Sequence, residues 1–212
     1  MKINSIIDLV KDLDTSRQTK NLNKLLIRIL LHLQVEFSSI IILLGAYYWK
    51  NNQYDACKNW YRSKMLYNIG AYQSAKEEYE TLYPELKNRG AFLFEYGYCL
   101  HKLKQYDSST KVLKEAMEYS NDPMILNIIG KNYQAVGKYE KAEESLIRST
   151  HRLPGRIYPY YLLAKLYAEP ENQQPEKLKR MVEVVLTKEP KVQSTAVKEM
   201  RAEVKKLLKQ IN

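Results

Sequence analysis

The residues that most often carry catalytic or metal chemistry are few and scattered in this chain of 212 residues. His32, His101 and His151 lie far apart and form no HExxH motif, and Cys57 and Cys99 form no CxxC pair. Neither a glycine-rich phosphate loop nor the GxSxG motif of hydrolases occurs. We expect both cysteines to be free thiols, although their number also permits one disulfide in an oxidising compartment. The sequence therefore predicts a protein that is not an enzyme, with no catalytic residue, no metal and no cofactor.

Aromatic and basic side chains are the second group of residues that could serve a function, and their chemistry suits the binding of a partner. Tyrosine occurs 18 times against three phenylalanines and two tryptophans, and every tyrosine lies between Tyr47 and Tyr167. The formal net charge of +10 favours acidic partners without choosing among nucleic acid, anionic lipid and acidic peptide. No run of five or six like charges occurs, so a solvated surface of mixed charge is expected and nucleic acid is disfavoured as a partner.

A repeat of about 34 residues would position these side chains. The string NIIGKNYQAVGKY from Asn127 matches FEYGYCLHKLKQY, which begins 33 residues earlier at Phe94. The matched residues are Gly97 with Gly130, Tyr106 with Tyr139 and, 34 residues further back, Tyr72 with Tyr106. Seven glycines and seven prolines are few for a turn-rich β protein, whereas this period is typical of stacked two-helix units.

The third unit, counted from Pro123, resembles the tetratricopeptide repeat (TPR) family at nearly every characteristic position. The matching residues are Leu126, Ile129, Gly130, Tyr133, Gly137, Tyr139, Ala142, Leu146, Ser149 and Pro154. The resemblance implies an all-α, TPR-type right-handed superhelical solenoid of antiparallel helix hairpins. We expect four TPR-like units, at residues 56–89, 90–122, 123–156 and 157–192. An amphipathic helix over residues 194–211 is expected to cap the solenoid, with its basic face in water.

The first fifty residues are a different kind of sequence. Residues 4–13 predict a short helix, and three aspartates among the first 14 residues argue against a signal peptide. Residues 21–49 are strongly apolar, apart from a helical stripe of ionisable residues at intervals of four: Lys24, Arg28, His32 and Glu36. The uncharged part, residues 37–49, would be about 20 Å long as a helix, which is shorter than the hydrocarbon core of a bilayer.

Three hypotheses stay open for this apolar segment. It could be a helix pair that caps the first repeat, a membrane anchor through residues 25–49, or a helix that binds a partner. The expected location is accordingly the cytoplasm or the inner membrane.

In TPR folds the first helix of each unit lines a concave groove, and the resemblance assigns twelve residues to it. They are Trp60, Lys64, Tyr67, Phe94, Tyr98, His101, Asn127, Lys131, Gln134, Tyr158, Tyr161 and Lys165. Such a surface suits an extended peptide, with Lys64, Lys131 and Lys165 meeting carboxylates. The alternative for each tyrosine is that it packs between repeats. The lysine and asparagine arrangement with which some TPR proteins clamp a chaperone's C-terminal carboxylate is not reproduced.

Longer strings resemble the C-terminal TPR tail of bacterial O-antigen ligase and polymerase family membrane proteins. They include WYRSKMLYNIGAYQSA, YPELKNRGAFLFEYG and GRIYPYYLLAKLYAE, and the resemblance extends from about Ile40 to Leu208. It implies that residues 37–49 correspond to the last membrane span of such proteins. Their glycan-transferring site lies in a multi-span domain with no counterpart here, so their catalysis is not carried over.

We therefore expect a non-catalytic TPR scaffold that binds a peptide or protein and is linked to surface-polysaccharide assembly. The alternatives are a membrane-anchored assembly factor and a nucleic-acid-binding protein that uses the basic C-terminal surface.

Overall fold

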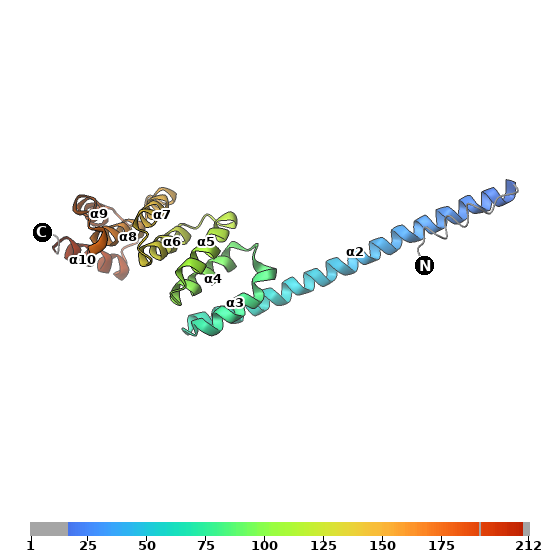
Figure 1. The fold of residues 1–212 in the computed structure, drawn as a ribbon, viewed down its shortest axis with the longest axis horizontal. Coiled ribbons are helices and arrows are strands. Elements are labelled where there is room, and N and C mark those ends of the chain that lie inside the picture. Colours follow the sequence, from blue (N-terminus) through green and yellow to red (C-terminus); the bar gives the residue numbers. More distant parts are fainter. Residues whose placement is uncertain (1–16, 191, 210–212) are drawn as a thin grey trace. The chain divides into compact units, whose positions relative to one another are not determined.

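The computed structural model describes residues 17–190 and 192–209, and these residues form nine α-helices, one 3-10 helix and no strand (Figure 1). The expected short helix over residues 4–13, the aspartates of the first 14 residues and the last two residues of the expected capping helix lie outside the described residues. The chain divides into two units, Met1–Asp55 and Ala56–Asn212.

Helix α2 runs from Arg17 to Asn68 and so contributes to both units. Within the first unit most of its described apolar side chains are exposed, as for Phe37 and Tyr47. Residues 24–68 form a helix that is long and apolar enough to cross a membrane, judged by length and composition alone. The sequence predicted an apolar segment ending near residue 50 and a separate helix from residue 56. The structure has no break there, because residues 50–55 contain neither glycine nor proline to end the helix.

The second unit is a stack of helix hairpins that follow one another along the chain (Figure 1). The end of α2 contacts α3 through the Arg62–Glu78 ion pair (3.4 Å), and three further hairpins and a last helix follow. Their bounds are α3 Tyr72–Leu86, α4 Gly90–Lys102, α5 Tyr106–Tyr119, α6 Pro123–Ala135, α7 Tyr139–Arg152, α8 Tyr158–Ala168, η1 Pro170–Asn172, α9 Pro175–Thr187 and α10 Thr195–Lys209. This arrangement confirms the predicted all-α solenoid of hairpins with a C-terminal capping helix.

The turns inside the first three hairpins use one backbone conformation. Gly70, Lys104 and Gly137 have φ angles of 81°, 60° and 70°, and each follows the first helix of its hairpin. A left-handed residue at this place closes the helix end, and glycine adopts it without steric cost. Lys104 therefore holds a conformation that its side chain disfavours.

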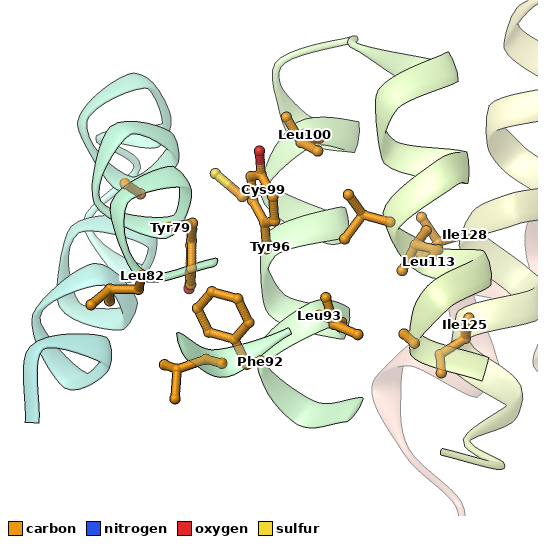
Figure 2. Packing of buried hydrophobic residues seen from close by; sticks show 14 of the residues in the cluster. Tyr79, Leu82, Phe92, Leu93, Tyr96, Cys99, Leu100, Leu113, Ile125 and Ile128 are labelled. Atoms are coloured by element: carbon orange, nitrogen blue, oxygen red, sulfur yellow. The ribbon is translucent and has the colours of Figure 1, made fainter. Parts of the chain in front are cut away.

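The core forms where neighbouring helices bury their apolar faces. Figure 2 shows Tyr79 of α3 facing Phe92 of α4, while Leu93 of α4 lies toward Leu113 of α5. Gly97 makes this second contact possible, because a Cβ atom there would lie 2.6 Å from Cγ of Leu113. The repeat keeps glycine at this position because the two helices of a hairpin approach closely there.

Helix α10 closes the C-terminal end of the solenoid by packing on α8 and α9. Val197 and Val204 are buried in this contact. The Arg201 guanidinium donates hydrogen bonds to the carbonyl oxygens of Val185 (3.1 Å) and Lys188 (2.8 Å), at the end of α9. Carbonyls at a helix C-terminus lack partners within the helix, so the arginine both caps α9 and fixes α10.

Candidate peptide-binding groove

A cavity of about 580 Å³ lies across three successive hairpins of the second unit. Six of the twelve predicted groove residues line it: His101, Lys131, Gln134, Tyr158, Tyr161 and Lys165. Tyr106, Ala135, Tyr139, Leu162 and Glu169 complete the lining. The volume falls within the range of small-ligand and side-chain pockets, and the lining combines rings with cationic and amide groups. We call this cavity the central pocket.

Of the two lysines that line the central pocket, Lys131 has no acidic partner among the described residues, whereas Lys165 has one. Lys131 is half-buried on α6. Burial lowers the pKa of Lys131, and the nearby charges of Lys102 and Lys165 lower it further. A buried ammonium group with cationic neighbours is stabilised by an incoming anion, because the anion replaces lost hydration and offsets repulsion.

The other two predicted groove lysines are paired inside the protein. Nζ of Lys165 lies 2.9 Å from Oε1 of Glu203 in α10, and the Tyr161 hydroxyl donates to Oε2 of the same carboxylate at 2.5 Å. These two contacts lower the pKa of Glu203. Nζ of Lys64 lies 2.8 Å from Oε1 of Glu95. Lys64 and Lys165 therefore do not offer an uncompensated charge to a partner.

His101 enters the central pocket from α4 and is fixed by a network of hydrogen bonds. Its Nδ1 lies 2.6 Å from Oδ1 of Asn132, whose Nδ2 donates to Oγ of Ser109 (2.8 Å) and Oγ1 of Thr110 (3.1 Å). Ser109 Oγ in turn donates to the carbonyl oxygen of Gly97 at 2.6 Å. Since the amide nitrogen of Asn132 faces both hydroxyls, its oxygen faces His101, and Nδ1 of His101 must carry the proton.

Burial lowers the pKa of His101, so the ring is neutral at neutral pH. With the proton on Nδ1, Nε2 of His101 is a hydrogen-bond acceptor. The pocket thus combines one uncompensated cation, Lys131, with a neutral ring that can accept a hydrogen bond.

The predicted groove residues outside the central pocket mostly form a row of rings. The rings of Phe94, Tyr98 and His101 stack in series, with centroids 6.0 and 5.8 Å apart, and Tyr67 lies 5.9 Å from Tyr98. Trp60, Tyr67, Phe94 and Tyr98 also pack against the apolar core. Their half-buried faces give the groove an aromatic wall next to the pocket.

Asn127 lies below the groove surface, with 2% of its area exposed. Its Nδ2 lies 3.5 Å from the sulfur of Met124, and its Oδ1 has no hydrogen-bond partner among the described residues. Asn127 does not line the central pocket.

Four acidic or aromatic residues of the site escaped the sequence analysis. Tyr106 and Tyr139 entered the sequence analysis only as matched positions of the 34-residue repeat, not as groove residues. Glu169 accepts a hydrogen bond from Gln134 at 2.6 Å, and Glu203 reaches the groove from α10. Glu169 follows the last residue of α8 and Glu203 lies on α10, so neither is on the first-helix face from which the groove positions were taken.

Comparison with known proteins supports the fold. No protein-family model matches the sequence, and no curated protein matches it at a significant level. Among solved structures, MamA 41-end from Desulfovibrio magneticus RS-1 is similar, with 18% identity, a TM-score of 0.53, and coverage of 73% of this chain and 76% of that one. The MamA RS-1 ArsTM double mutant is similar too, with 18% identity, a TM-score of 0.53, and coverage of 74% of this chain and 78% of that one. At this identity the likeness shows the fold alone, a TPR-type helical repeat.

Proposed function

We propose that the protein is a non-catalytic TPR scaffold that binds an extended acidic segment of a partner protein in the groove of its second unit. The observation that carries the proposal is Lys131, a half-buried cation in the central pocket whose charge no described carboxylate offsets. A carboxylate in the pocket would gain a charge-assisted hydrogen bond there. The aromatic wall from Phe94 to His101 offers ring faces to the neighbouring side chains of the same segment.

The expected partner follows from this chemistry. Because Lys64 and Lys165 are already paired with Glu95 and Glu203, one carboxylate at Lys131 is the main electrostatic anchor. The remaining affinity would come from apolar and aromatic side chains that pack on the rings, as in other extended-peptide grooves.

The test measures the anisotropy of fluorescent ten-residue peptides that differ only in how many glutamates they carry. Lys131→Glu should weaken binding of the acidic peptides by tenfold or more, since a charged hydrogen bond contributes about 1.5–3 kcal/mol. The matched control is Lys198→Glu, the same charge change at an exposed position of α10. Equal effects of the two substitutions would refute binding at the central pocket.

A second candidate function is a membrane-anchored assembly factor, and the apolar helix supports it. Residues 24–68 are long and apolar enough to cross a bilayer, and Tyr47, Tyr48 and Trp49 lie exposed at the end of the apolar run. Retention of the full chain in membranes after carbonate extraction, and release when residues 1–50 are deleted, would support this function. The resemblance to O-antigen ligase tails leads us to propose bacterial surface-polysaccharide assembly as the setting for either function.

A further inference from the structure

We propose that two copies of this protein associate in parallel through helix α2, along a seam formed by residues 26–54. The seam belongs to the first unit and is separate from the peptide groove, so this inference goes beyond the proposed function. It rests on the spacing of the residues, on their exposure and on the charges that flank them.

The seam follows the 3-4 spacing of a coiled coil through four heptads. Its nine positions are Leu26, Leu30, Leu33, Phe37, Ile40, Leu44, Tyr47, Asn51 and Tyr54. Eight of the nine are apolar or aromatic, and all nine lie on helix α2. Residues at alternate intervals of four and three share one side of a helix and pack into the matching side of an identical helix.

Only this choice of seam positions gives a nearly unbroken apolar row, even though the segment is apolar on most sides. If every seam position is moved one residue toward the N-terminus, the row contains the polar residues His32, Glu36, Ser39, Lys50 and Gln53. If every position is moved one residue toward the C-terminus, the row contains Gln34, Ser38, Gly45, Asn52 and Asp55. Lys24, Arg28 and His32 fall at the outer b, f and c positions of the heptad, away from the seam. The sequence thus keeps one continuous apolar side.

Eight of the nine seam residues are exposed, and Leu30 is half-buried. Phe37 is 70% exposed, Leu44 63%, Tyr47 72% and Tyr54 68%. Exposed apolar side chains in a continuous row mark an interaction surface.

Polar residues at the C-terminal end of the seam specify a second copy in parallel orientation. Lys50 occupies a g position and Asp55 the following e position, which meet between the two chains of a parallel pair. Neither residue has an ion pair within the described chain, and the two-fold relation would form the Lys50 to Asp55 contact twice. Asn51 stands at an a position, where an asparagine fixes the register of two strands at some cost in stability.

The pairing is compatible with a bilayer around residues 37–49. Helices in membranes pack at the same left-handed crossing angle as coiled coils, and an apolar segment shorter than the bilayer favours association. In that case lipid covers the outward apolar residues such as Ile41 and Ile42, while the second copy covers the seam.

The first experiment is disulfide cross-linking of the full chain in a Cys57→Ser background, where buried Cys99 remains. Asn51→Cys places a thiol on the seam, and the matched control Asn52→Cys places it one residue away on an outward side. Both asparagines are exposed, so reactivity is comparable. Mild oxidation should give several-fold more covalent dimer with Asn51→Cys. Equal dimer yields, or none from either variant, would overturn the proposal and leave lipid alone as the cover of α2.

A charge exchange tests the parallel orientation without a cross-link. Lys50→Glu should lower the dimer fraction of the full chain in detergent by several-fold, because the new carboxylate faces Asp55 of the second copy. Lys50→Glu combined with Asp55→Lys should restore it, since the attractive pair is re-formed with opposite sign. A double variant that stays as weak as the single one would contradict the parallel seam.

Discussion

At the scale of single residues, His101 joins the polar interior of the solenoid to its groove. Its ring lines the central pocket, while its Nδ1 is held by Asn132, which is almost fully buried. The same network explains Ser109, which stands 33 residues before Ala142, at the matching position of the second unit. Its hydroxyl accepts from Asn132 and donates to the carbonyl of Gly97, so a polar residue is satisfied in a tight helix contact.

Acidification should destabilise the solenoid through His101. Burial lowers the pKa of this ring in the folded chain, so the unfolded chain binds the proton first as pH falls through about 6.5. The contribution of His101 is therefore fully present above pH 6.5 and is lost as pH falls toward its folded pKa. Urea unfolding at pH 7.5 and 5.5 measures it.

His101→Gln is the control for this measurement, because glutamine can donate to Asn132 but does not titrate. Between the two pH values the wild-type free energy of unfolding should fall more than that of the variant. Parallel pH profiles would show that His101 is not held neutral.

At the scale of elements, the second and third hairpins each contain one close contact between a glycine and the facing helix. In the third hairpin a Cβ atom at Gly130 would lie 2.7 Å from Cγ of Leu146. The sequence matches Gly130 to Gly97 and to a characteristic position of the repeat. It could not predict that α2 continues unbroken into the first hairpin, because the polar residues 51–53 are compatible with either a helix or a linker.

Gly130→Ala should lower the free energy of unfolding by about 1–3 kcal/mol, because Leu146 must leave its preferred position. Leu146→Ala alone should cost about 2–5 kcal/mol by opening a cavity. The double variant should lose less than the sum, since the new methyl group occupies part of that cavity. Urea denaturation measures all three.

Gly155→Ala provides the comparison, because a Cβ atom there would have no neighbour within 4 Å. It should change stability by less than about 0.5 kcal/mol. If Gly130→Ala is equally mild, the close contact is not a constraint on the hairpin.

At the scale of the whole molecule, the buried core and the apolar N-terminal part of helix α2 belong to different units. Every buried residue of the two apolar clusters lies at Ala56 or beyond. Deleting residues 1–50 should therefore leave the free energy of unfolding of the solenoid within about 1 kcal/mol, as followed by circular dichroism during urea titration. Binding of acidic peptides should persist in this shortened chain.

Deleting residues 1–68 is the matched comparison. It also removes Trp60 and Tyr67, which pack on the core next to Phe92 and Tyr98. This longer deletion should destabilise the solenoid strongly, because it exposes the side chains of α3 and α4 that the end of α2 covers. Equal stability of the two shortened chains would place the first hairpin outside the folded unit.

The sequence by itself determined the hairpins, because helix propensity, glycine and proline positions and apolar spacing are local properties that recur every 34 residues. Through the resemblance to TPR proteins it also gave twelve candidate groove positions, one set on the same face of each first helix. Only the tertiary structure decided which of those positions line one pocket and which are already paired. Glu95 and Glu203 reach Lys64 and Lys165 from other helices, and a charge can be offset by any residue that folding brings within a few ångströms. The uncompensated charge of Lys131 is therefore a property of the folded chain.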